Sequence, residues 1–150
     1  LIRFRSNNLI KEKNMGLDMY AFRHKGARIT SKTDRDKLEG TKREIVQFAD
    51  WRKHNRLQGF MENIWNEKTG HHKMGVFNCE PLYLDRSDLD KLEEAIRSRS
   101  LPETSGFFFG QDSYTWQGEQ EDMKAYDLKF VANAKKYLNE GYEVFYECWW

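Results

Sequence analysis

The sequence lacks a cysteine framework, an excess of either charge, and any long hydrophobic run. Cys79 and Cys148 are too few and too far apart for a disulfide framework, so we expect reduced thiols in a cytoplasmic protein. Lys and Arg total 25 against 24 Asp and Glu, and this balance offers no argument for nucleic acid or a membrane as the partner. No apolar run approaches the roughly 18 residues of a membrane helix, and we expect no secretory signal.

Aromatic residues, by contrast, are abundant and make up 15% of the chain. Such side chains bury large apolar areas, and a disordered chain would contain few of them. A chain of 150 residues is also long enough to bury a core. We therefore expect one folded domain over residues 15–150, preceded at residues 1–14 by a flexible basic arm or an extension.

Hydrophobic periodicity predicts an α+β fold, with a small, mainly antiparallel sheet and about three helices packed on one of its faces. The expected elements are strands at 16–22, 79–84 and 142–150 and helices at 44–65, 85–100 and 119–139, with a charged loop at 23–43. Pro81 favours a sheet edge, because proline cannot donate a backbone hydrogen bond. Ser87, with Asp90 three residues later, is the expected N-cap of the second helix.

Three of these elements carry an apolar face at the spacing of a strand or a helix. The faces are Leu17, Met19 and Ala21 in the first strand, Leu89, Leu92 and Ile96 in the second helix, and Met123, Tyr126, Phe130, Ala134 and Tyr137 in the third helix. Gly141 is the expected C-terminal stop of the third helix, because glycine readily adopts the left-handed conformation found there.

The helix expected at 44–65 places polar side chains on its apolar face. At about 100° per residue, His54, Asn55 and Gln58 share a sector with Trp51 and Met61. A buried polar group without a partner costs about 1–3 kcal/mol, so these groups must be paired or line a wet cleft. Three interpretations follow: they bond to neighbouring strands and loops, they face a pocket and meet a ligand there, or the phase assigned to the helix is misplaced.

The segment "TSGFFFG" is the second unusual stretch. Three consecutive phenylalanines cannot all face one side of a strand, so one of them must point away from the core. The flanking glycines permit close approach of another group, and the amides after Thr104 and Ser105 could form an anion-binding nest. The segment is either a structural turn or a ligand contact. The predicted binding residues are Trp51, Arg52, His54, Asn55, Gln58, Thr104, Ser105, Gly106, Phe108 and Gly110.

Residues for catalysis or metal binding do not form a recognisable set. The sequence has no Gly-x-Ser-x-Gly elbow, and Cys79 has no obvious activating cation beside it. His71 and His72 are adjacent, which is not a standard zinc-ligand spacing, and no Cys-x-x-Cys pair exists. We therefore expect no catalytic residue, no metal and no cofactor.

Five segments taken in order resemble a family of small uncharacterised bacteriophage and prophage proteins that begin Met-Gly-Leu-Asp-Met-Tyr. The segments are "MGLDMYAF", "WRKHNRLQGFMEN", "CEPLYLDRSDLDKLEE", "SGFFFG" and the Cys-Trp-Trp ending, and together they span residues 15–150. This chain departs from the family at Asp50, where a tyrosine is common. The resemblance implies an origin and an order of parts, and it implies neither a substrate nor an activity.

The first hypothesis for function is a non-enzymatic binding module that antagonises a host defence or regulatory protein or sequesters a small nucleotide, working in the host cytoplasm. The second is an enzyme acting on a nucleotide or phosphoester, with His54 as acid/base and Arg52 holding an anion. The third is a nucleic-acid-binding protein that uses the basic arm and the Arg52-Lys53-Arg56 patch. No membrane partner is expected.

Overall fold

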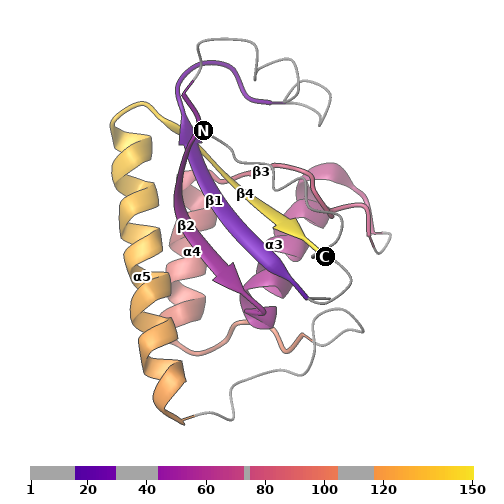
Figure 1. Cartoon of the computed structure of the whole chain (residues 1–150), viewed down its shortest axis with the longest axis vertical. Helices are drawn as coiled ribbons and strands as arrows, with labels where there is room; N and C mark the ends of the chain where they lie inside the picture. Colours follow the sequence, from indigo (N-terminus) through magenta and orange to yellow (C-terminus); the bar gives the residue numbers. More distant parts are fainter. Residues whose placement is uncertain (1–15, 30–43, 73–74, 105–116) are drawn as a thin grey trace, which may run out of the picture.

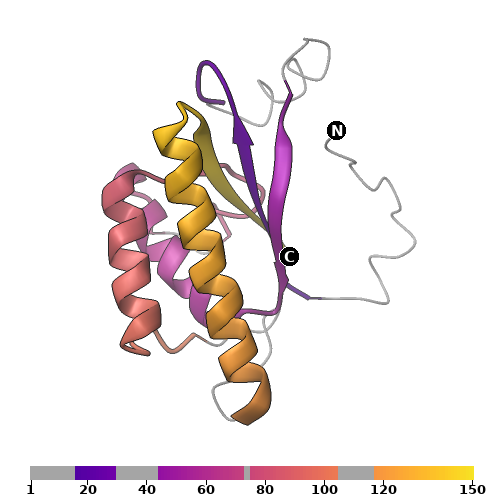
Figure 2. The same cartoon turned by 90° about the vertical axis from the view of Figure 1, so that its left-hand side faces the viewer.

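The computed structural model describes residues 16–29, 44–72, 75–104 and 117–150, with side chains from residue 122 onward in the last range. The elements are β1 (Asp18–His24), β2 (Val46–Arg52), α3 (Asn55–Thr69), β3 (Leu82–Tyr83), α4 (Arg86–Arg97), α5 (Gln117–Asn139) and β4 (Glu143–Trp149). The strands form one antiparallel sheet in the order β2-β1-β4-β3. The three helices of these ranges lie on one face of the sheet (Figure 1, Figure 2), which confirms the predicted α+β architecture.

Strand β1 lies at the centre of the sheet, with β2 on one side and β4 on the other. Its Tyr20 stands opposite Asp50 of β2 and Glu147 of β4. The apolar face predicted for this strand is confirmed, because Leu17, Met19 and Ala21 are fully buried. Strand β3 is shorter than predicted, with only two residues, but it occupies the edge position that Pro81 indicated.

The predicted helix over 44–65 is wrong in its first part, where the chain forms strand β2. Buried Ala49 and Trp51 alternate there with exposed Asp50 and Arg52, which is the period of a strand with one face in the core. Lys53 then adopts a left-handed conformation with φ of 55° and turns the chain into α3. The predicted helix therefore gave His54, Asn55 and Gln58 the wrong angular positions relative to Trp51, which lies in the strand.

The N-cap predicted for the second helix is also wrong, by two residues. Asp85 caps α4, and its backbone N–H donates to Oδ2 of Asp88 at 2.8 Å, which completes a capping box. Two residue pairs have the three-residue spacing of a capping box, Asp85 with Asp88 and Ser87 with Asp90. The first pair forms the box, and Ser87 lies inside the helix. The apolar stripe of this helix is confirmed: Leu89, Leu92 and Ile96 are buried.

The long helix α5 buries a slightly different face from the predicted one. Phe130 and Ala134 are buried as expected, whereas Tyr126 is 40% exposed. The buried stripe consists of Asp127, Phe130, Val131 and Ala134, at the i, i+3, i+4 and i+7 spacing of a helix. Gly141 follows the helix with φ of 86°, which agrees with the expected C-terminal stop.

Two hydrophobic clusters lie on opposite faces of the sheet. The larger one fills the space between the sheet and the helices. The smaller one, on the other face, consists of Phe22, Ile29, Ile45, Tyr83 and Phe145. The rings of Phe22 and Phe145 stack there with centroids 5.0 Å apart. None of the helices in the described ranges combines the length and the apolar character that a membrane-crossing helix needs.

Candidate functional site

The junction between β2 and α3 holds the polar residues singled out in the sequence. Trp51 donates its Nε1–H to Oδ1 of Asp127 at 2.8 Å, and His54 contacts Oδ2 of the same carboxylate through Nε2 at 2.6 Å. Asp127 comes from α5, and both it and His54 are at most 3% exposed. The carboxylate thus receives two hydrogen bonds and fixes the junction to α5.

Sequence analysis did not single out Asp127, although a sign of its position was available. It shares the spacing of Phe130, Val131 and Ala134, all of which face the core. A carboxylate on such a stripe must find buried donors, because an ionised group alone in an apolar interior is strongly destabilising. Trp51 and His54 are those donors.

Gln58 and Asn55 are also buried, at 0% and 1% exposure. The Tyr146 hydroxyl donates to Oε1 of Gln58, and Nε2 of Gln58 donates to Sγ of Cys148 at 3.2 Å. Burial raises the pKa of Tyr146 and of the Cys148 thiol well above their ordinary values. These contacts match the interpretation in which the buried polar side chains join α3 to neighbouring strands.

Three cations lie at the outer side of the same junction. Arg52 has a side chain 53% exposed and forms a loose ion pair with Asp18, at 3.9 Å from Nε to Oδ1. Lys53 is exposed, while its backbone N–H donates to the carbonyl of Leu17 at 2.8 Å. Arg56 is half-buried and donates from Nη1 to the carbonyl of Leu101 at 2.8 Å. The junction therefore presents positive charge to solvent.

The segment that leads into the triple-phenylalanine stretch packs against α3. A Cβ atom added to Gly59 would lie 1.9 Å from Oγ1 of Thr104 and 3.3 Å from Cγ of Pro102, so only glycine allows this approach. Thr104 is half-buried at this contact. The structure thus brings Thr104 to the helix that carries Arg56, whereas Ser105, Gly106, Phe108 and Gly110 lie outside the described residues.

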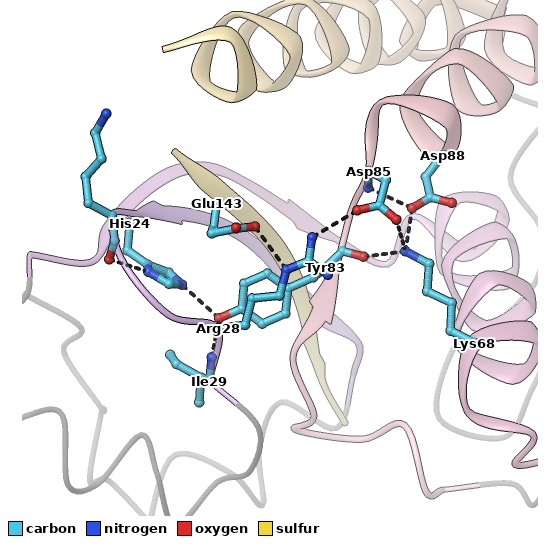
Figure 3. Close-up of polar contacts among 9 residues, drawn as sticks. His24, Arg28, Ile29, Lys68, Tyr83, Asp85, Asp88 and Glu143 are labelled. Carbon is cyan, nitrogen blue, oxygen red and sulfur yellow. Dashed lines mark hydrogen bonds and ion pairs between the residues drawn. The ribbon is translucent and has the colours of Figure 1, made fainter. Parts of the chain in front are cut away.

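A second polar network lies at the opposite end of β1 (Figure 3). Arg28 donates from Nη2 to Asp85 at 2.9 Å and from Nε to Glu143 at 3.0 Å. Lys68, at the end of α3, contacts both Asp85 and Asp88. Partial burial would raise the pKa of Asp85, but the Arg28 hydrogen bond and the Lys68 charge outweigh it and hold that pKa below its ordinary value.

Tyr83 and His24 form the buried part of this network. The Tyr83 hydroxyl accepts from the backbone N–H of Ile29 at 2.7 Å and lies 2.8 Å from Nε2 of His24. The His24 Nδ1 lies 2.9 Å from the carbonyl of Lys25, so Nδ1 carries the proton and the hydroxyl donates to Nε2. Together, these hydrogen bonds hold the chain after β1 against β3 (Figure 3).

The hollow between β2 and α5 is small. It has a volume of about 90 Å³ and is lined by Phe48, Ala49, Tyr126, Lys129, Phe130 and Asn133. Pockets for small-molecule ligands usually begin at about 300 Å³. Across the described ranges, no three His, Cys, Asp or Glu side chains are grouped so as to hold a metal ion.

Comparisons with known proteins add no further assignment. No protein-family model, no curated protein and no solved structure matches this chain. The residues of the β2–α3 junction and the chain that packs beside it are therefore the basis for assigning a function.

Proposed function

We propose that this protein is a non-enzymatic binding module whose contact surface is the basic corner, defined as Arg52, Lys53, Arg56 and Thr104. The observation that carries the proposal is the close approach of Thr104 to Gly59. This approach holds the chain from Leu101 to Thr104 against the helix that carries Arg56, whose guanidinium donates to the carbonyl of Leu101. Arginine is enriched at protein-binding surfaces, and the corner carries two arginines, Arg52 and Arg56.

The buried polar residues support this corner from beneath. Asp127 holds Trp51 and His54, and Gln58 joins α3 to β4. The backbone that carries the contact residues is anchored in this way, so it loses little further conformational freedom on binding, and this lowers the entropic cost of association. We therefore assign Trp51, His54, Asn55 and Gln58 a supporting role and Arg52 and Lys53 the contact itself.

The chemistry of the corner favours an acidic protein surface as the partner. Arg52 and Lys53 supply exposed positive charge, which steers association with a surface of opposite charge. The hollow between β2 and α5 is too small to take a nucleotide, and none of its lining residues belongs to the corner. Together with the resemblance to phage proteins, this favours an accessory protein that antagonises a host defence or regulatory protein.

The test compares two variants that each lose two positive charges. Arg52→Gln/Lys53→Gln alters the corner, and Lys91→Gln/Lys136→Gln alters exposed positions on α4 and α5. Proteins retained from a bacterial lysate by the immobilised wild-type chain are identified and purified. The Kd of each retained protein is then measured for the wild type and for the two double variants. We expect at least about a tenfold weaker Kd for the corner variant alone, equivalent to about 1.4 kcal/mol.

Other outcomes would assign another function or none. Equal Kd values for the two variants would overturn the corner as the contact surface. Release of product from a nucleotide panel, abolished by His54→Ala, would make the protein an enzyme. Binding to DNA or RNA that weakens steeply with salt would make it a nucleic-acid-binding protein.

A further inference from the structure

The two cysteines are far apart in the sequence but adjacent in the fold. The backbone N–H of Cys79 donates to the carbonyl of Cys148 at 2.9 Å, which joins the turn before β3 to the end of β4. Cys79 itself lies in the turn before β3, with φ of 65°, and the backbone hydrogen bond brings it directly beside Cys148. Disulfides need Cα separations of about 4.4–6.8 Å, so the backbone positions are suitable for a disulfide.

The sulfur of Cys148 points toward the turn that carries Cys79. Its Sγ lies 3.7 Å from the carbonyl oxygen of Phe77, two residues before Cys79. The charge on Cys79 is one of the causes, after burial, that raise the pKa of the Cys148 thiol, which agrees with this proximity. The Cys79 thiol donates to Oδ1 of Asn78 at 3.6 Å, so it gives up this weak contact when its side chain turns toward Cys148.

The two residues before Cys79 hold the turn in place on two sides, against β4 and against α3. The Asn78 side chain donates from Nδ2 to the carbonyl of Trp150 at 3.0 Å and accepts from the Trp150 N–H at 3.1 Å. On the other side, the ring of Phe77 stacks on Trp65 of α3 with centroids 5.2 Å apart. The turn is therefore fixed against both β4 and α3, so the cysteine pair stays aligned.

The two thiols differ in their access to solvent. Cys148 is fully buried, whereas Cys79 is half-buried. An oxidant in solution therefore reaches Cys79 first, and Cys148 becomes the second thiol to react.

We propose that Cys79 and Cys148 form an intramolecular disulfide when the protein meets a small disulfide such as oxidised glutathione. The Cys79 thiolate attacks one sulfur of glutathione disulfide, whose S–S bond breaks and releases one glutathione thiolate. The Cys148 sulfur then attacks the Cys79 sulfur, and its proton passes to the departing glutathione thiolate, which leaves as the second glutathione thiol. Two protein thiols are oxidised, and one glutathione disulfide is reduced to two thiols.

The cross-link would tie the approach to β3 to the end of β4. The loop that it closes contains α4 and α5, so the disulfide removes many conformations from the unfolded chain. Closing a long loop stabilises the folded state, provided that the bond forms without distortion. The oxidised protein is therefore expected to melt at a higher temperature than the reduced one.

The full-length chain is incubated with excess oxidised glutathione at mildly alkaline pH and analysed by intact mass and peptide mapping. We expect a monomer that has lost two hydrogen atoms, a Cys79–Cys148 peptide pair, and a rise in Tm that dithiothreitol reverses. Cys79→Ser serves as the control and should show neither the mass change nor the rise in Tm. Its Cys148 should remain a free thiol.

Two results would overturn the proposal. A glutathione adduct on Cys79 that persists without forming the protein disulfide would show that the sulfur atoms cannot meet. A dimer linked through Cys79 would show that Cys79 reacts outward, away from Cys148. Peptide mapping of the wild-type chain distinguishes these products from the internal disulfide, so the test does not depend on the folding of any variant.

Discussion

Asp127 and His54 are joined by a contact of 2.6 Å between carboxylate Oδ2 and imidazole Nε2, and neither side chain has significant access to solvent. An ionised carboxylate can only accept a hydrogen bond, so the imidazole carries a proton on Nε2. The other carboxylate oxygen accepts from Trp51. Three elements, β2, α3 and α5, therefore meet at one buried carboxylate that lies beneath the exposed cations of the basic corner.

Replacing Asp127 by alanine should destabilise the fold strongly. The change removes the acceptor of both Trp51 and His54 and leaves two donors buried. Each unsatisfied buried group costs about 1–3 kcal/mol, so we expect a loss of about 2–6 kcal/mol in the free energy of unfolding measured in urea. Asp122→Ala, at an exposed position on the same helix, should change it by less than about 0.5 kcal/mol. Similar losses in both variants would contradict the structural role of Asp127.

Gln58 and Tyr146 should show energetic coupling. Gln58→Met leaves the Tyr146 hydroxyl without its acceptor, and Tyr146→Phe leaves Oε1 of Gln58 without its donor. The double variant leaves neither group unsatisfied, so its loss of stability should be smaller than the sum of the single losses by about 0.5–3 kcal/mol. Urea unfolding of the four proteins measures this difference. Strictly additive losses would mean that the hydrogen bond contributes nothing specific.

The fold could be predicted best where the hydrophobic periodicity of a segment and the length of that segment indicated the same kind of element. The apolar faces of β1 and α4 were recognisable because each strand or helix is separated from its neighbours by charged or turn residues. The β2–α3 region failed because Trp51 and Asn55 are separated by only three residues, and apolar residues recur through both elements at a spacing close to that of a helix. A strand of seven residues offers too few alternations to override that pattern.

The site was predictable only in part, for a different physical reason. The sequence indicates that buried polar groups such as Gln58 need partners, because unsatisfied groups are destabilising. It does not indicate which partners, since Asp127 and Tyr146 reach the junction only through tertiary packing. The pairing of Cys79 with Cys148 depends on the position of β4 beside the turn before β3, which no local spacing reveals.

Gly59 should not tolerate alanine, although alanine normally stabilises a helix interior by about 1 kcal/mol relative to glycine. The added Cβ would overlap with Oγ1 of Thr104, so the segment from Leu101 to Thr104 would have to move away from α3. We expect Gly59→Ala to lower Tm and to increase proteolysis near Thr104. Gly59→Ala/Thr104→Gly removes the overlapping side chain and should recover most of the lost stability. If Thr104→Gly does not recover the stability lost in Gly59→Ala, the overlap with Thr104 is not the cause of that loss.

The network around Asp85 should make stability sensitive to acid (Figure 3). Partial burial acts to raise the pKa of Asp85, but Arg28 and Lys68 together lower it below the ordinary 3.8. Because the folded-state pKa lies below the unfolded one, the contribution of Asp85 is fully present above the unfolded pKa. It is lost as pH falls through the folded pKa.

Arg28→Gln should therefore weaken this acid dependence. The substitution removes the hydrogen bond that lowers the pKa of Asp85, so the folded and unfolded values move closer together. We expect the free energy of unfolding of the wild type to fall more steeply than that of the variant between about pH 5 and pH 2. Lys91→Gln removes one positive charge from an exposed site on α4 and should follow the wild-type curve. Parallel curves for wild type and Arg28→Gln would mean that solvent already screens the Arg28–Asp85 ion pair completely, because both side chains are about half exposed.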